Sequence, residues 1–173
     1  GMSNPIPLSG SPATGTASGL IKPIGDNDLY SFTLAAPSSV RLEVFIGGAG
    51  QCTAATNSTD AQFELRGPDC NTVLGGDDDD GPGLCPLIDP TVAADSFARA
   101  LPANTYFVKV FKHLNSALIN LYQLKLTVVS TCGNGVCQPA CGESQNSCAA
   151  DCGVACQCGN GQCQAACGET ILN

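Results

Sequence analysis

Apolar and polar residues alternate along most of the chain between Ser18 and Ser130. Because successive side chains of a strand point to opposite faces, this period of two predicts strands with one buried face. Strong helical patterns, with a period of 3.6 residues, are missing. The expected inward positions are Tyr30, Phe32 and Leu34, then Val40, Leu42 and Val44, then Tyr106, Val108 and Val110, and last Tyr122, Leu124, Leu126 and Val128.

Residues typical of turns separate these apolar runs, at positions that include Gly25-Asp26-Asn27, Gly67-Pro68-Asp69 and Pro102-Ala103-Asn104. About seven or eight short strands with such breaks, and no helices between them, predict an all-β chain folded as a jelly-roll-like β-sandwich. We expect the inward aromatic residues Tyr30, Phe32, Tyr106 and Tyr122 to pack in the core and not to form a ligand platform. Phe107 and Phe111 lie on the opposite face, where one of them is a candidate contact for a partner.

Composition divides the chain into three parts. Residues 1–17 are rich in Pro, Ser, Gly and Thr, which predicts a linker. Residues 18–130 form the predicted sandwich, with 43% hydrophobic residues in the chain as a whole to supply its core. Residues 131–173 hold a tandem cysteine repeat with little regular structure, and its second copy is incomplete.

The repeat begins as CGNGVC at Cys132 and again as CGNGQC at Cys158. A zinc site needs paired Cys-x-x-Cys or Cys-x-x-His ligands, and no such pair occurs, so disulfides are expected in place of zinc or iron–sulfur ligation. Disulfides indicate an oxidising compartment. The cysteines of the tail are Cys132, Cys137, Cys141, Cys148, Cys152, Cys156, Cys158, Cys163 and Cys167, and those of the sandwich are Cys52, Cys70 and Cys85.

Both sets are odd in number, so complete oxidation within one chain requires a bridge between sandwich and tail. Within the sandwich we favour Cys70 with Cys85, which would close a loop around the acidic run that lies between them. Cys52 with Cys70, or one free thiol in each set, are the alternatives. The connectivity of the tail cannot be deduced from sequence.

The formal net charge is −8 with only 7 Lys plus Arg, which argues against nucleic acid and anionic lipid as partners. No segment has the 18 or so consecutive apolar residues that a membrane-spanning helix needs. The start of the chain lacks the pattern of a secretory signal, so we expect that an export signal has been removed and that the protein is secreted or at the cell surface.

The most concentrated charge in the chain is the run Asp77-Asp78-Asp79-Asp80, followed by Gly81-Pro82-Gly83. Adjacent carboxylates on a tight loop repel one another unless they are hydrated or neutralised, and the chain has few cations to pair them. Ca²⁺ accepts six to eight hard oxygen ligands in flexible geometry, so it is the natural partner. The alternative is a solvated acidic loop without a bound ion.

Catalytic motifs are missing from the sequence. His113, the single histidine, follows Lys112 near a strand end and is expected to be an ordinary surface residue. No Gly-x-Ser-x-Gly turn and no His-Glu-x-x-His motif occurs, and a hydrated acidic loop gives no reason for the split carboxyl pKa values of a glycosidase. We therefore expect no enzyme activity and no organic cofactor in this chain.

The sandwich segment, from about Ala17 to Val129, resembles the bacterial pre-peptidase C-terminal domain. The resemblance rests on ordered motifs: GDNDLYSF from Gly25, FELR from Phe63, LGGDDD from Leu74, LPANTYFVKV from Leu101 and YQL from Tyr122. Asn104 stands where the family usually has Gly, and Asn tolerates a left-handed backbone well enough to replace it. Related domains of secreted collagenases bind calcium through acidic residues, so the resemblance adds Asp26 and Asp28 as possible ligands.

The tail is similar to Notch-type repeats, which are small, disulfide-bonded and arranged around calcium. This similarity implies that Asn134, Glu143 and Asp151 are oxygen ligands in the first copy. The second copy ends before its closing Asp and Cys, so it cannot supply a complete calcium site.

By resemblance, the expected function is that of a non-catalytic accessory region of a secreted bacterial protein. Such domains are fused to an extracellular hydrolase, often a peptidase, and aid its secretion, maturation or attachment to substrate. The expected partners are the other domains of the parent protein and an extracellular protein or polysaccharide. The alternative is an extracellular structural or adhesion module with calcium-stiffened repeats, and the full reading frame upstream would separate the two.

Overall fold

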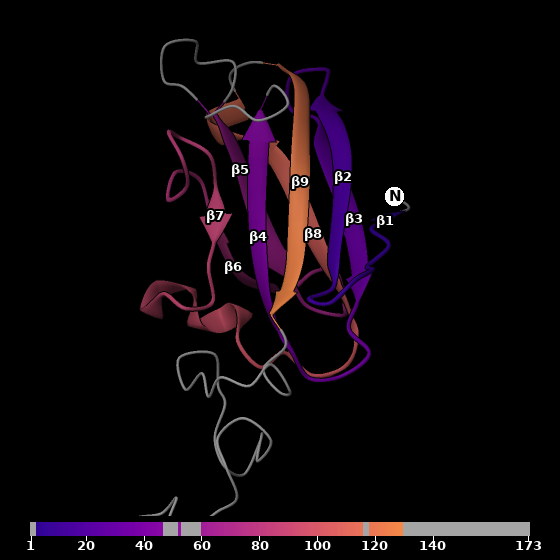
Figure 1. Cartoon of the computed structure of the whole chain (residues 1–173). Helices are drawn as coiled ribbons and strands as arrows, with labels where there is room; N and C mark the ends of the chain where they lie inside the picture. The colour runs from indigo at the N-terminus through magenta and orange to yellow at the C-terminus, as the bar shows by residue number, and fades with distance from the viewer. Residues whose placement is uncertain (1–2, 47–51, 53–59, 116–117, 130–173) are drawn as a thin grey trace, which may run out of the picture.

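The computed structural model describes residues 3–46, 52, 60–115 and 118–129 (Figure 1). The residues predicted as ligands in the cysteine-rich tail, Asn134, Glu143 and Asp151, lie outside the described residues. In this part of the chain the strands form two sheets. The five-stranded sheet contains β1 (Asn4–Pro5), β3 (Asn27–Thr33), β8 (Thr105–Lys112), β5 (Ala61–Arg66) and β6 (Val73–Asp77), in that order. The four-stranded sheet contains β2 (Thr14–Ile21), β9 (Ile119–Val129), β4 (Ser39–Ile46) and β7 (Leu87–Ile88), in that order.

The strand order is that of a jelly roll. From β2 to β9 the chain crosses repeatedly between the sheets, giving the orders β3-β8-β5-β6 and β2-β9-β4-β7. Neighbouring strands are antiparallel, and only the short β1 pairs in parallel with β3. Eight strands arranged as two Greek keys define the jelly-roll architecture, so the predicted fold class is confirmed for the sandwich.

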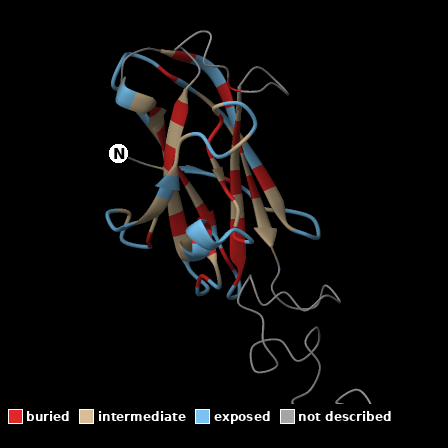
Figure 2. Cartoon of the chain, turned by 90° about the vertical axis from the view of Figure 1, so that its left-hand side faces the viewer, coloured by how far each residue is buried: buried red, intermediate tan, exposed pale blue. Residues whose placement is uncertain are grey.

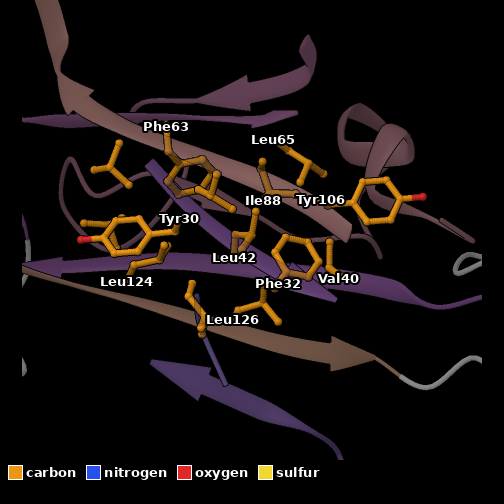
Figure 3. Packing of buried hydrophobic residues seen from close by; sticks show 14 of the residues in the cluster. Tyr30, Phe32, Val40, Leu42, Phe63, Leu65, Ile88, Tyr106, Leu124 and Leu126 are labelled. Atoms are coloured by element: carbon orange, nitrogen blue, oxygen red, sulfur yellow. The ribbon is translucent and has the colours of Figure 1, made fainter. Parts of the chain in front are cut away.

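The core fills the space between the two sheets (Figures 2 and 3). Its members come from alternate positions of each strand, as the period of two predicts, and include Tyr30, Phe32, Val40, Leu42, Phe63, Leu65, Tyr106, Val108, Leu124 and Leu126. The rings of Phe32 and Tyr106 stack with their centroids 5.9 Å apart. The aromatic residues therefore pack in the core, as expected, whereas Phe107 and Phe111 are half-buried on the outer face.

The prediction of a linker over residues 1–17 is wrong for the described part of that segment. β1 lies within it, β2 begins within it at Thr14, and Ile6 is buried in the core. Ile6 closes the open edge between β3 and β2, and Gly15 of β2 makes room for it, because a Cβ at Gly15 would stand 2.6 Å from Ile6 Cγ2. The composition of β2 did not indicate a strand, because its few apolar residues are separated by Gly, Ser and Thr.

The sandwich has two ends that matter for function. We call the end where β4, β6 and β8 finish the upper end, and the end where β3, β5 and β9 finish the lower end (Figure 1). The acidic run follows β6 at the upper end. A short 3-10 helix, η2 (Ala93–Ala98), packs on β6, and η3 (His113–Asn115) follows β8. None of the helices in the described residues is long and apolar enough to cross a membrane.

Candidate functional site

Asp77, the last residue of β6, anchors the acidic loop to the opposite sheet. Its Oδ2 accepts hydrogen bonds from the backbone N–H of Leu87, at 2.7 Å, and of Asp80, at 3.1 Å. Burial raises the pKa of Asp77, while these two N–H donors act in the opposite direction and favour the carboxylate. Asp77 therefore joins β6 to β7 and bends the loop back on itself.

Three of the four predicted carboxylates gather at this loop. Oxygen atoms of Asp77, Asp79 and Asp80 all lie within 4.8 Å of one another, with Asp79 and Asp80 exposed to solvent. Asp78 is directed elsewhere, because its Oδ2 lies 2.8 Å from Nδ1 of His113. His113 is thus half-buried beside a carboxylate rather than an ordinary surface residue. The remaining three carboxylates present several oxygen atoms on one exposed loop, the donor set that Ca²⁺ prefers.

A buried disulfide holds the far side of the loop. Cys52 and Cys85 are bonded, and both are fully buried. Two backbone hydrogen bonds reinforce the arrangement, from Leu84 N–H to Cys52 O at 2.7 Å and from Gly81 N–H to Cys85 O at 2.8 Å. The loop that carries the carboxylates is thus fixed at Asp77 on one side and at Cys85 on the other.

The favoured pairing of Cys70 with Cys85 is therefore wrong. Cys70 lies in the turn between β5 and β6, at the lower end of the sandwich, whereas Cys85 follows β6. The length of β6 separates the two residues. Cys70 is half-buried and has a free thiol among the described residues. Its φ of 63° places it in the left-handed region that the turn requires.

Asp28, a predicted calcium ligand, faces the interior instead. Its Oδ2 accepts a hydrogen bond of 2.6 Å from the hydroxyl of Tyr122, and the Tyr122 and Tyr30 hydroxyl oxygens are 2.8 Å apart. Gly19 of β2 covers this cluster so closely that an added Cβ would stand 2.5 Å from both Asp28 Oδ2 and Tyr122 Oη. Burial raises the pKa of Asp28, partly offset by the hydrogen bond from Tyr122.

Asp28 and Asp26 are consequently not part of the acidic loop. Asp28 pairs with Val110, Val110 with Phe63, and Phe63 with Asp77 across the sheet. Three strand spacings amount to about 14 Å, too far for one ion to bind both carboxylates. Asp26 closes its own turn, with Oδ1 accepting a 2.9 Å hydrogen bond from Asn27 N–H.

Sequence reasoning missed two charged groups, Lys112 at the upper end and Asp95 in η2, which packs on β6 towards the lower end (Figure 1). Lys112 is almost fully buried, and its Nζ lies 3.2 Å from Oδ2 of Asp60, so this ion pair ties the end of β8 to the start of β5. Asp95 of η2 is buried and accepts a 2.7 Å hydrogen bond from Asp89 N–H. Burial, and then the negative charges of Asp80 and Asp89, raise the pKa of Asp95. The charge of Asp95 therefore adds to the negative potential at the loop.

No protein-family model and no curated protein matches this chain. Similar solved structures include the periplasmic g-type lysozyme inhibitor PliG of Aeromonas hydrophila, at 19% identity and a TM-score of 0.43 over 73% of this chain and 95% of the other. The pre-peptidase C-terminal domain of collagenase from Bacillus anthracis has 17% identity and a TM-score of 0.44 over 73% and 94%. PliG of Salmonella Typhimurium has 19% identity and a TM-score of 0.40 over 73% and 99%. Likeness at this level assigns no function.

Proposed function

We propose that this chain is a non-catalytic accessory region of an exported multidomain protein, and that its sandwich binds calcium at the acidic loop of its upper end. The observation that carries the proposal is the gathering of Asp77, Asp79 and Asp80 within 4.8 Å on a loop fastened at both sides. The buried Cys52–Cys85 bridge supports an oxidising compartment, as in secreted proteins. The ordered motifs that resemble pre-peptidase C-terminal domains support a role in secretion, maturation or substrate attachment.

The loop is organised before any ion arrives, which favours binding. Asp77 is held by the N–H groups of Leu87 and Asp80, and Cys85 is held by Cys52. The three carboxylates are therefore kept close together at the cost of their mutual repulsion, which a divalent cation would remove. Pre-organisation of this kind reduces the ordering entropy that binding must overcome. Because Asp79 and Asp80 are exposed, we expect weak binding, with a Kd of about 10⁻⁴ to 10⁻³ M as in other extracellular modules.

Calorimetric titration of Ca²⁺ into the full chain tests the proposal. The comparison is between the wild type, Asp79→Asn, and Asp69→Asn as a matched control. Asp69 is an exposed carboxylate in the β5–β6 turn at the lower end, where it accepts hydrogen bonds from Asn71 and Thr72 that an amide oxygen can also accept. Asp79→Asn should remove one binding event, and Asp69→Asn should leave the titration unchanged.

Variants are compared within the same chain so that calcium bound by the cysteine-rich tail appears equally in all of them. Identical titrations of wild type and Asp79→Asn would reject calcium binding at the loop. In that case the accessory assignment would rest on the disulfide and the motif resemblance alone. Turnover of a peptide, ester or glycoside by pure protein, abolished by a point substitution in this chain, would reject the non-catalytic assignment.

A further inference from the structure

The outer face of the five-stranded sheet carries an apolar stripe with a lysine at its centre. Phe107, Lys109 and Phe111 of β8 alternate with the buried residues Val108 and Val110, so their side chains point away from the core. Each of the three is half-buried. Because β8 lies between β3 and β5, the stripe runs along the middle of this face, which is turned away from the viewer in Figure 1.

The neighbours of Lys109 leave its charge unpaired. Its Nζ lies 4.5 Å from the centroid of the Phe111 ring, a cation–π contact that holds the ammonium group over one of the two rings. Glu64 is its register partner in β5, but the Glu64 Oε2 atom accepts a hydrogen bond of 3.0 Å from Arg66 Nε. Lys109 forms no ion pair with any residue in the described part of the chain. Lys109 can therefore bind an anion from outside the chain.

The sign of the charge on this face differs from that of the whole chain. Among the outward residues of the described strands in this sheet, Lys109 and Arg66 are cations and Glu64 is the one carboxylate. The chain as a whole has a formal net charge of −8. An acidic partner is therefore repelled by most of the surface and attracted to this face, which orients its approach. Charge complementarity thus favours an acidic partner.

The spacing of the stripe matches that of an extended polypeptide. Alternate side chains of a strand are about 6.8 Å apart and point to the same side. A segment laid along β8 with the pattern apolar, any, acidic, any, apolar therefore places its carboxylate at Lys109 and its apolar side chains on Phe107 and Phe111. No strand in the described residues presents this pattern at its outward positions, and β4, for example, presents a cation, an acid and an aromatic ring. A second copy of the chain is therefore a poor match.

We propose that the stripe of Phe107, Lys109 and Phe111 binds an extended acidic segment of a partner protein, in which apolar residues stand two positions before and two positions after a carboxylate residue. The apolar contacts hold the segment on the sheet, and the ion pair selects the partner. The proposal adds a partner to the accessory role. It does not depend on calcium binding, because the acidic loop contributes no residue to the stripe.

A titration with two synthetic peptides tests the proposal. The probes are acetyl-TVTETVT-amide, which has the pattern, and acetyl-TVTKTVT-amide, which has lysine in place of glutamate. Each is added to the ¹⁵N-labelled full chain without calcium, and the amide signals of β3, β5 and β8 are followed. We expect the glutamate peptide to shift these signals and to bind about fivefold more tightly than the lysine peptide, a ratio that one partly exposed ion pair can supply. Lys109→Glu should reverse the preference.

Lys22→Glu is the matched control. Lys22 is an exposed lysine in the turn after β2, and it also forms no ion pair within the described residues. Its replacement should leave the preference for the glutamate peptide unchanged. If Lys109→Glu disturbs the sheet, Lys109→Gln should abolish the preference without reversing it.

Equal binding of the two peptides by the wild type, or no shift with either peptide, would overturn the proposal. So would a loss of preference in Lys22→Glu as large as that in Lys109→Glu. Shifts of the same signals by polygalacturonate but not by the glutamate peptide would reject it in favour of an acidic polysaccharide. Shifts that follow protein concentration in the absence of peptide would reject it in favour of a second copy of the chain.

Discussion

Asp28 and Asp77 stand at the two ends of one row that crosses the five-stranded sheet through Val110 and Phe63. Each carboxylate reaches the other sheet: Asp28 binds the hydroxyl of Tyr122 in β9, and Asp77 binds the N–H of Leu87 in β7. The apolar middle of the row packs in the core, and its charged ends fasten the two open edges of the sandwich. Aspartate thus has a structural role at one edge and the proposed calcium-binding role at the other.

Lowering the pH from neutral towards the unfolded aspartate pKa of 3.8 is expected to increase the contribution of Asp28, Asp77 and Asp95 to the free energy of unfolding. Burial raises the pKa values of Asp28, Asp77 and Asp95, so each takes up a proton more readily in the folded state. Their contribution to stability is complete below the unfolded pKa and is lost as pH rises through the folded pKa. Asp69, whose pKa is lowered by hydrogen bonds from Thr72, acts in the opposite sense only at lower pH.

Urea unfolding at about pH 7 and about pH 4, for the wild type and for Asp28→Asn, measures this effect. The variant should show a smaller increase on acidification, because one of the titrating groups is gone. A variant whose free energy of unfolding rises on acidification as much as that of the wild type would contradict the raised pKa of Asp28.

Replacement of Tyr122 by Phe is expected to destabilise the sandwich by about 1–3 kcal/mol. The buried hydroxyl of Tyr122 is bonded to both Asp28 and Tyr30, and its loss leaves the half-buried Asp28 carboxylate and the buried Tyr30 hydroxyl without that partner. Tyr106→Phe is the control, since its hydroxyl bonds only the carbonyl of Pro102 at the domain surface. Urea denaturation should rank Tyr122→Phe as the more costly change, and equal losses would argue against a special role for the cluster.

The disulfide should contribute about 3–4 kcal/mol, as expected for a bridge that closes a 33-residue separation. The double variant Cys52→Ala/Cys85→Ala removes it without leaving a thiol. We expect a lower melting temperature and weaker calcium binding, because the far side of the acidic loop is released. Calcium affinity equal to that of the wild type would show that Asp77 alone is sufficient to organise the loop.

Cys70 is expected to form a disulfide with one of the nine cysteines of the tail. With Cys52 and Cys85 paired, Cys70 is left over, and the tail contributes an odd number. The turn that holds Cys70 lies at the lower end of the sandwich, the end at which β9 finishes, so a tail cysteine can reach it. Peptide mapping without reduction identifies the partner. A free Cys70 thiol in oxidised, monomeric protein would contradict this prediction.

Much of the fold could be predicted because burial follows the period of two. The inward positions of β3, β4, β8 and β9 are those that alternation indicates. β2 was missed because Gly15 and Gly19 carry its close contacts with Ile6 and Asp28, and glycine gives no hydrophobic signal. The disulfide could not be predicted, since three cysteines allow several pairings and the choice depends on which strand ends meet.

The sequence did contain a signal that would have corrected the site. Asp28 has the same parity as Tyr30 and Phe32, and Lys112 has the same parity as Val108 and Val110, so alternation alone would have placed both with the inward residues. The charges of Asp28 and Lys112 suggested positions at the surface, but the registers of β3 and β8 place both side chains inward. The acidic loop, in contrast, follows the end of a strand, where no parity rule applies.

The most direct test of calcium binding at the acidic loop is a titration of Ca²⁺ followed through the side-chain carboxyl ¹³C resonances of the aspartates. We expect the signals of Asp77, Asp79 and Asp80 to shift together with one Kd in the range of about 10⁻⁴ to 10⁻³ M. Those of Asp28 and Asp69 should stay in place. Shifts that are spread over all aspartates, or that are reproduced by sodium chloride at equal ionic strength, would contradict a calcium site at this loop.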